Sequence, residues 1–170
     1  MTTKEKVMPL IGIIAKKREI QSIKKCIKES SIEIIGITKD ALKNVKNIVF
    51  EEIIILEDIK LEEEEYKYMN EIISKTKYLI LNVDIKIEFL KQMSIDKPIK
   101  VITFGFNTKS TITISSVKEE KIIVCLQRDI KMLNGKIIES QEKEIKLNKE
   151  NDKKIYNKLV IFIVNELHNL

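Results

Sequence analysis

Short runs of Ile and Val alternate with amphipathic stretches along most of this chain, and this alternation constrains the fold more than any other feature. A strand buried on both faces of a parallel sheet appears in a sequence as a short apolar run, and the connection to its parallel neighbour usually contains a helix. The pattern therefore predicts an α/β fold with a three-layer, mostly parallel sheet flanked by helices. The expected strands are Leu10–Ala15, Ile32–Ile37, Phe50–Leu56, Tyr78–Val83 and Ile99–Phe104.

Helices are expected where apolar residues recur three and four positions apart. Two such segments, Arg18–Glu29 and Leu61–Ser74, lie between predicted strands, and Glu88–Met93 is a shorter one. The glutamates at 62–65 fall in a first turn, where negative charge suits the helix dipole. A last helix is predicted over Asn151–Leu167, with an apolar stripe that packs on the sheet or on a partner.

After Gly105 the pattern changes to that of an antiparallel extension. Polar and apolar residues alternate over Thr111–Ser116, which predicts a half-exposed strand. The dipeptide Asn134-Gly135 predicts a hairpin turn, because it suits positive φ at both central positions. The further expected elements are the turn Val117–Glu120 and the strands Lys121–Leu126, Ile130–Leu133, Lys136–Glu139 and Glu144–Leu147.

The length of 170 residues fits a single domain. We divide residues 1–170 into a parallel α/β part at 1–107, antiparallel strands at 108–150 and a C-terminal helix at 151–170. Hydrophobic residues at 44% exclude a disordered chain. The abundance of Ile, Lys and Asn is typical of an A+T-rich bacterial coding bias.

Composition also argues against several functions. The net charge of +5 is spread over the chain rather than gathered in a basic patch, and aromatic residues are only 5%, so nucleic-acid binding is not expected. The two cysteines form no CxxC pair, so we predict no metal and no cofactor. The apolar runs Val7–Ala15 and Leu159–Val164 are too short to span a bilayer, and a cytoplasmic protein without a membrane segment is expected.

Catalytic motifs are sparse. His168, the one histidine, lies close to the C-terminus in a helix end that is expected to fray, which disfavours a Ser-His or Cys-His device. Cys125 lies in an apolar strand and is predicted to be structural. The carboxylate pairs Glu51-Glu52 and Glu119-Glu120 flank strands and are interpreted as solvated turns. No catalytic residue is therefore assigned.

Two segments, LILNVD at Leu79–Asp84 and VITFGFN at Val101–Asn107, resemble the end of the Mur ligase central domain. That family has a strand with an Asn-x-Asp signature, a helix, a VITFG strand and then alternating polar and apolar residues. The resemblance covers about 79–128, and more weakly the segment LIGIIAKKREIQSIKK near the N-terminus. It implies a nucleotide-binding fold ancestry.

The family's phosphate-binding loop is missing. A P-loop needs glycines so that consecutive backbone amides can surround the phosphates, and AKKREIQS contains none. Lys16 or Lys17 alone would attract an anion only as an unoriented charge. We also find no counterpart of the family's magnesium-binding Glu and His. ATP-dependent ligation is therefore not expected, and the resemblance implies a shortened, catalytically silent relative.

Without ligase activity, the activity that the resemblance still implies is ligand binding. It implies that Asn82 contacts an adenine, with Asp84 nearby at the carboxyl edge of the sheet, although capping of the following helix is the interpretation we favour for both. Residues 16–18 could form an anion site, but the interpretation we favour for them is a solvated basic turn. Arg128 could orient an acidic ligand or pair with Asp129 or Glu142. The candidate ligand-binding residues are Lys16, Lys17, Asn82, Asp84, Thr103 and Arg128.

Three hypotheses follow. The first is a noncatalytic, Mur-ligase-like cytoplasmic protein that binds a partner protein, a nucleotide or a peptidoglycan precursor, with a regulatory role. The second is an interaction module that self-associates or joins a complex through its antiparallel strands and C-terminal helix, which an exposed apolar patch on that helix would support. The third is a small enzyme with a pocket around Lys16, Asn82 and Thr103.

Overall fold

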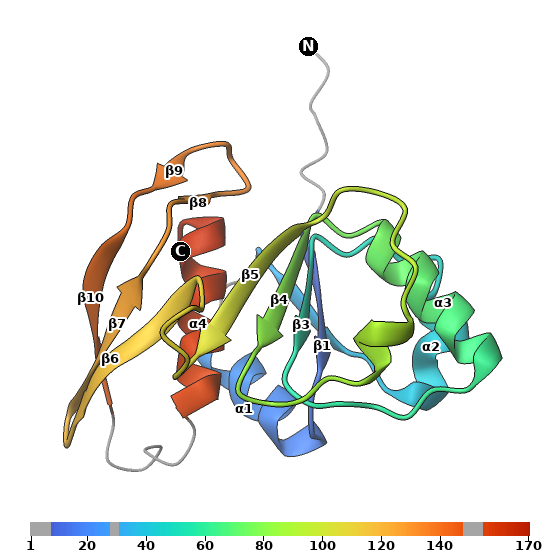
Figure 1. The fold of residues 1–170 in the computed structure, drawn as a ribbon, viewed down its shortest axis with the longest axis horizontal. Coiled ribbons are helices and arrows are strands. Elements are labelled where there is room, and N and C mark those ends of the chain that lie inside the picture. Colours follow the sequence, from blue (N-terminus) through green and yellow to red (C-terminus); the bar gives the residue numbers. More distant parts are fainter. Residues whose placement is uncertain (1–7, 28–30, 148–154) are drawn as a thin grey trace.

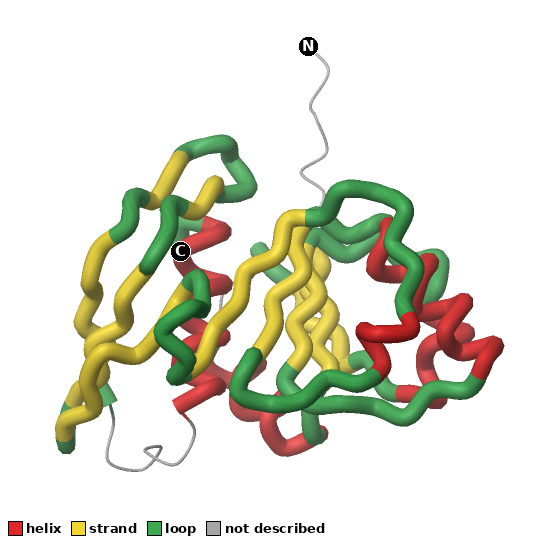
Figure 2. Tube along the Cα trace, viewed as in Figure 1, coloured by secondary structure: helices red, strands yellow, loops and turns green. Residues whose placement is uncertain are grey.

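The fold is described from a computed structural model, which covers residues 8–27, 31–147 and 155–170. Eight strands form one sheet in the order β10-β7-β6-β5-β4-β3-β1-β2, and helices pack on both of its faces (Figures 1 and 2). The prediction of an α/β fold with a mostly parallel sheet, an antiparallel hairpin and a C-terminal helix is confirmed.

The parallel strands follow the predicted apolar runs closely. Strand β1 lies between β2 and β3, so the chain reverses its direction of travel across the sheet at β1. The strands are buried on both faces at this centre because their Ile and Leu side chains point alternately into two apolar clusters. These strands are β1 (Leu10–Ile14), β2 (Glu33–Gly36), β3 (Glu52–Ile55), β4 (Tyr78–Asn82) and β5 (Lys100–Gly105).

The helices are divided between the two faces. Apolar side chains of α1 and α4 join one cluster, while those of α2, α3 and η2 join the other. The positions 28–29 and 151–154 of two predicted helices lie outside the described residues. The helical segments are α1 (Lys17–Cys26), η1 (Lys39–Ala41), α2 (Leu42–Val45), α3 (Glu63–Ser74), η2 (Phe89–Gln92) and α4 (Ile155–His168).

The antiparallel strands continue the same sheet. Strand β6 runs parallel to β5 through two residue pairs and antiparallel to β7, so it joins the two parts of the fold. Strand β10 pairs with the far side of β7, and β8 and β9 form a separate two-stranded sheet. The strands are β6 (Ile112–Lys118), β7 (Lys121–Leu126), β8 (Ile130–Lys131), β9 (Ile137–Ile138) and β10 (Gln141–Lys146).

The predicted half-exposed strand at 111–116 is wrong over its first half. Thr111 and Thr113 are buried, as are Ile112 and Ile114. Helix α4 packs on one face of this segment, and the Thr111 amide donates a hydrogen bond to Thr103 of β5. A bulge between Ile114 and Ser116 then shifts the register, and the strand continues to 118. The turn is therefore shorter than the expected 117–120.

The Asn134-Gly135 hairpin is present, but its predicted geometry is wrong. Only Gly135 has positive φ, at 88°, and Asn134 does not. Strands β8 and β9 share only two residue pairs, so five residues separate them instead of a two-residue turn. The Asn134 side chain accepts a hydrogen bond from the Lys136 amide at 3.0 Å, which closes this wider loop.

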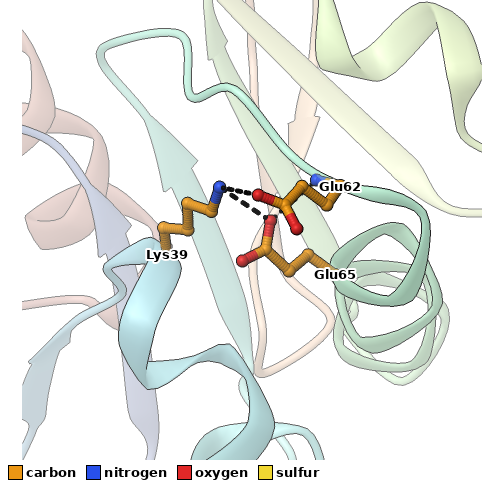
Figure 3. Close-up of polar contacts among 3 residues, drawn as sticks. All are labelled: Lys39, Glu62 and Glu65. Atoms are coloured by element: carbon orange, nitrogen blue, oxygen red, sulfur yellow. Dashed lines mark hydrogen bonds and ion pairs between the residues drawn. The ribbon is translucent and has the colours of Figure 1, made fainter.

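The short helical segment η1–α2 had no counterpart among the predictions, because few apolar residues mark it. Leu42 is its buried anchor. Lys39 ties the segment to the start of α3: its Nζ lies 3.2 Å from carboxylate oxygens of both Glu62 and Glu65 (Figure 3). The Glu62 amide also donates to Glu65 at 2.7 Å. The acidic run thus starts the helix, as its position predicts.

Helix α4 is the centre of one half of the core. Leu159, Val160, Ile163, Val164 and Leu167 are each at most 1% exposed, packed against the sheet of their own chain and against α1. The exposed apolar patch that would support association through this helix is absent from its described residues. No helix in the described ranges is long and apolar enough to cross a membrane.

A buried contact between His168 and Glu52 joins the end of α4 to the start of β3. Nε2 of His168 lies 2.7 Å from Oε1 of Glu52, and the two side chains are 6% and 0% exposed. The interpretation of Glu51-Glu52 as a solvated turn is therefore wrong for Glu52, and the expected fraying near His168 is wrong as well. Burial raises the pKa of Glu52, while the contact with His168 lowers it, and the net direction is upward.

Candidate functional site

A pocket of about 330 Å³ lies where the carboxyl ends of β1, β3 and β4 meet. In open α/β sheets this edge binds ligands where the strand order reverses, and here the order reverses between β1 and β3. The volume is at the small end of the range of about 300–1,000 Å³ for ligand pockets. The polar residues that line it and matter below are Lys16, Glu19, Glu57, Asp58, Asn82 and Asn157.

The start of α1 forms one wall of this pocket. Lys16 precedes the helix with extended backbone, and its amide donates to the Glu19 carboxylate at 3.3 Å. A helix N-terminus attracts anions because its first amides have no partner within the helix. In this chain one of its own carboxylates takes that position, so a phosphate would have to displace it.

Carboxylates dominate the charge of the pocket. Glu19, Glu57 and Asp58 line it together with a single cation, Lys16. Burial raises the pKa of Glu57, the Glu19 carboxylate raises it further, and Lys16 lowers it. These three carboxylates repel a further anion, so the pocket favours uncharged or cationic groups over phosphates.

Asn82 and Asp84 form a turn at the end of β4. The Asn82 side chain, 1% exposed, accepts a hydrogen bond from the Asp84 amide at 3.0 Å. The expected capping of the next helix is wrong for both residues, because η2 begins five residues after Asp84. Instead the amide of Phe89, the first residue of η2, donates a hydrogen bond to the Asp58 carboxylate at 3.3 Å. Asn82 is held at the pocket wall by its own turn.

Asp84 connects three segments rather than lining the pocket. Its Oδ2 accepts hydrogen bonds from the Phe106 amide at 2.6 Å and from the Tyr156 hydroxyl at 3.0 Å. The Tyr156 ring also packs edge-on against Phe104 and Phe106. Burial, reinforced by the Asp84 carboxylate, raises the pKa of Tyr156 to about 12. This contact fixes the start of α4 beside the pocket.

Replacing Tyr156 with phenylalanine should lower the free energy of unfolding by about 1.5–3 kcal/mol, because it removes one hydrogen bond to a charged acceptor and keeps the ring packing. Urea denaturation followed by circular dichroism would measure the change. Tyr66→Phe is a suitable control, because no hydrogen bond of the Tyr66 hydroxyl occurs among the described residues. A loss as small as that of the control would show that the Asp84 contact contributes nothing.

Asn157 lines the pocket and carries an unused hydrogen-bond donor. Its side chain is 5% exposed, and its Nδ2 has no hydrogen-bond partner within the described ranges. An unpartnered buried amide costs about 1–3 kcal/mol, so such groups in native proteins call for an explanation. A bound ligand that accepts this hydrogen bond would provide one.

The other predicted site residues lie elsewhere. Lys17 is exposed in the first turn of α1 and does not line the pocket. The Thr103 hydroxyl faces β6 and accepts the Thr111 amide at 2.9 Å, so its hydrogen-bonding capacity is used within the sheet. Arg128 lines a different hollow, near the amino end of β5. The structure therefore brings together only Lys16 and Asn82 of the six candidates.

Sequence reasoning missed Glu19, Glu57 and Asn157. The sequence does contain a signal for Glu57, because this residue directly follows the apolar run of β3, where carboxyl-edge residues are expected. Asn157 interrupts an otherwise apolar helix face, which is a weaker signal of the same kind. Glu19 had none, because a glutamate in a first helical turn is ordinary.

Two other observations limit the chemistry. Among the described residues, no group of three or more His, Cys, Asp or Glu side chains could hold a metal ion. A larger hollow of about 850 Å³ lies beside the β6–β7 turn, but residues of strongly mixed charge line it, among them the ion pair Lys121–Glu144. None of the residues that line this hollow is a buried polar residue such as Asn82 or Asn157.

Comparison of the chain with protein-family models and with curated proteins found no match.

Proposed function

We propose that this protein is a noncatalytic, Mur-ligase-like cytoplasmic binding protein, and that its ligand site is the pocket at the carboxyl edge of β1, β3 and β4. The ligand is the nucleoside part of a nucleotide or of a nucleotide-linked peptidoglycan precursor. The observation that carries the proposal is the unpartnered amide of buried Asn157, which lines this pocket together with buried Asn82.

Two amides suit a nucleobase. A carboxamide offers both a donor and an acceptor, which match the edges of a base without requiring charge. The resemblance to Mur ligases independently implies contact between Asn82 and a base. Leu56 and Ile85 add apolar surface to the same pocket, against which the face of a base can pack.

The start of α1 supports the part of the proposal that excludes ligase activity. Phosphoryl transfer depends on a loop and a cation that hold the terminal phosphates. Here Glu19 occupies the helix start, and Glu57 and Asp58 add negative charge beside it. The phosphates of a bound nucleotide would therefore extend into solvent instead of being held for reaction.

The proposed family relationship rests on the sequence resemblance and on the order of elements that it includes. Segments 79–84 and 101–107, which carry the resemblance, include the neighbouring parallel strands β4 and β5, and antiparallel pairing begins after Gly105 as the resemblance implies. This order of elements is the reason for keeping the Mur-ligase-like proposal.

Thermal unfolding in the presence of adenosine, uridine, ATP and UDP tests the proposal. A ligand at 100 times its Kd should add about 2.7 kcal/mol of stability. We expect at least one nucleoside to raise the melting temperature. Asn157→Leu should abolish this shift and, because it removes an unpartnered amide, should stabilise the free protein by about 1 kcal/mol.

Asn165→Leu provides the matched control, since it makes the same change on the same helix outside the pocket. It should leave the ligand-induced shift intact. No shift with any of the four compounds would refute the nucleoside site, and an equal loss in both variants would show that the helix rather than the pocket is responsible.

A further inference from the structure

Two adjoining hollows lie at the opposite end of the strands from the nucleoside pocket. Each has a volume of about 330 Å³, and they share Tyr78, Lys100 and Lys131 as common walls. Tyr78 and Asn82 are at opposite ends of β4, so about 13 Å of strand separates this region from the pocket. Arg128, which the carboxyl-edge pocket does not use, lines one of the two hollows.

Tyr78 holds two of these lysines in place. The Lys100 Nζ lies 5.0 Å from the centre of the Tyr78 ring and donates to its hydroxyl at 3.4 Å. The same hydroxyl donates to the backbone oxygen of Lys131. Because the Tyr78 side chain is 3% exposed, the position of the Lys100 ammonium and of the Lys131 backbone is set by the core.

The positive charge of this region exceeds its negative charge, because Asp129 is the one carboxylate among the described residues that line the two hollows. Lys100, Arg128 and Lys131 take part in none of the ion pairs of the described ranges, and the predicted pairing of Arg128 with Asp129 or Glu142 does not occur. The Asp129 carboxylate instead accepts the Ser140 amide at 2.8 Å.

Lys100, Arg128 and Lys131 outnumber the single carboxylate of Asp129 here, so the region has a positive local potential. Gathering like charges is unfavourable unless an anion offsets them. An arginine also offers a planar pair of donors that matches the two oxygens of a phosphate or carboxylate group. The charge arrangement thus complements an oxyanion with an orientation set by Arg128.

We propose that this region is an anion-binding site, formed by Lys100, Arg128 and Lys131 around Tyr78, for the phosphate or carboxylate group of a small molecule. It is separate from the nucleoside pocket and does not depend on it. The Tyr78 ring and the aliphatic stems of the lysines line the site below the anion.

Titration calorimetry with pyrophosphate and, separately, citrate tests this proposal at low ionic strength. We expect binding of at least one, weakened tenfold or more when salt rises from about 20 to 200 mM because the contacts are ionic. Tighter binding of pyrophosphate would identify a phosphate ligand, and tighter binding of citrate a carboxylate ligand. Either result supports the site.

Variants distinguish a defined binding site from general attraction of anions by the positive charge of the protein. Arg128→Gln and Lys131→Gln change exposed side chains and should each weaken binding tenfold or more. Lys25→Gln removes an exposed cation of α1 and should leave binding unchanged. Circular dichroism would confirm that each variant is folded. No binding of either anion by the wild-type protein, or equal weakening by Lys25→Gln, would overturn the proposal.

Discussion

Replacing His168 with alanine should lower the free energy of unfolding by about 3–5 kcal/mol, because the change removes the side chain that contacts the buried Glu52 carboxyl group. Glu52 is fully buried, and its Oε1 lies 2.7 Å from His168 Nε2. Neither carboxylate oxygen makes an aligned hydrogen bond within the described residues, so no other group compensates the charge. Urea denaturation of both proteins would measure the loss.

The loss should depend on pH in a defined direction. Burial holds the pKa of Glu52 in the folded protein above its usual value of 4.5, and contact with His168 opposes this rise. A raised carboxyl pKa means that stability is greatest below the unfolded-state pKa and falls as pH rises through the folded-state pKa. His168→Ala should raise the pKa of Glu52 further, so the variant should lose more stability than the wild type as the pH rises above 4.5.

A double-mutant cycle identifies the cause. Glu52→Gln removes the buried charge at almost constant volume and should cost less than about 2 kcal/mol. In the Glu52→Gln background, His168→Ala should cost at least 1 kcal/mol less than in the wild type. Additive losses, or a His168→Ala effect that is independent of pH, would show that packing of the histidine ring matters and the ion pair does not.

Gly105→Ala is expected to cost about 3–5 kcal/mol. Gly105 has φ of 151°, and an added Cβ would lie 2.5 Å from Oδ2 of Asp84. The substitution would therefore combine backbone strain of about 1–3 kcal/mol with displacement of a carboxylate whose hydrogen bonds are worth about 1.5–3 kcal/mol each. Urea denaturation would again measure the effect.

Gly135→Ala is the matched control, because Gly135 also has positive φ, at 88°, but no atom lies within 4 Å of an added Cβ. It should cost only about 1–2 kcal/mol, from the left-handed backbone. The Gly105→Ala loss should shrink in an Asp84→Ala background, where the steric conflict is gone. Equal losses at the two glycines would contradict the role given to Asp84.

The sequence predicted the parallel core well because its physical cause is local. A strand buried on both faces must be a continuous apolar run, and the strands β1, β3 and β4 are such runs at the predicted places. The same reasoning failed at 111–114, where Thr111 looks solvent-facing but is buried and hydrogen-bonded to Thr103. A polar side chain with a partner in a neighbouring strand cannot be told from an exposed one by its spacing.

The candidate site depended even more on contacts between distant segments. Asn82 was predicted from the resemblance and Lys16 from its place between a strand end and a helix start, and strand ends meet at one edge of a parallel sheet. Asn157 reaches the same pocket from the C-terminal helix, and Glu52 is buried because His168 packs against it. Their roles depend on where α4 lies on the sheet, which no local pattern specifies.

The most direct test of the binding proposal compares adenosine with ATP and Mg²⁺ by titration calorimetry on the wild-type protein. The pocket presents amides from Asn82 and Asn157 but has Glu19 where a phosphate would bind. We therefore predict that adenosine binds at least as tightly as ATP and that Mg²⁺ does not strengthen ATP binding. Binding of ATP with Mg²⁺ more than tenfold tighter than adenosine, or no binding of adenosine, ATP or uridine, would contradict this account.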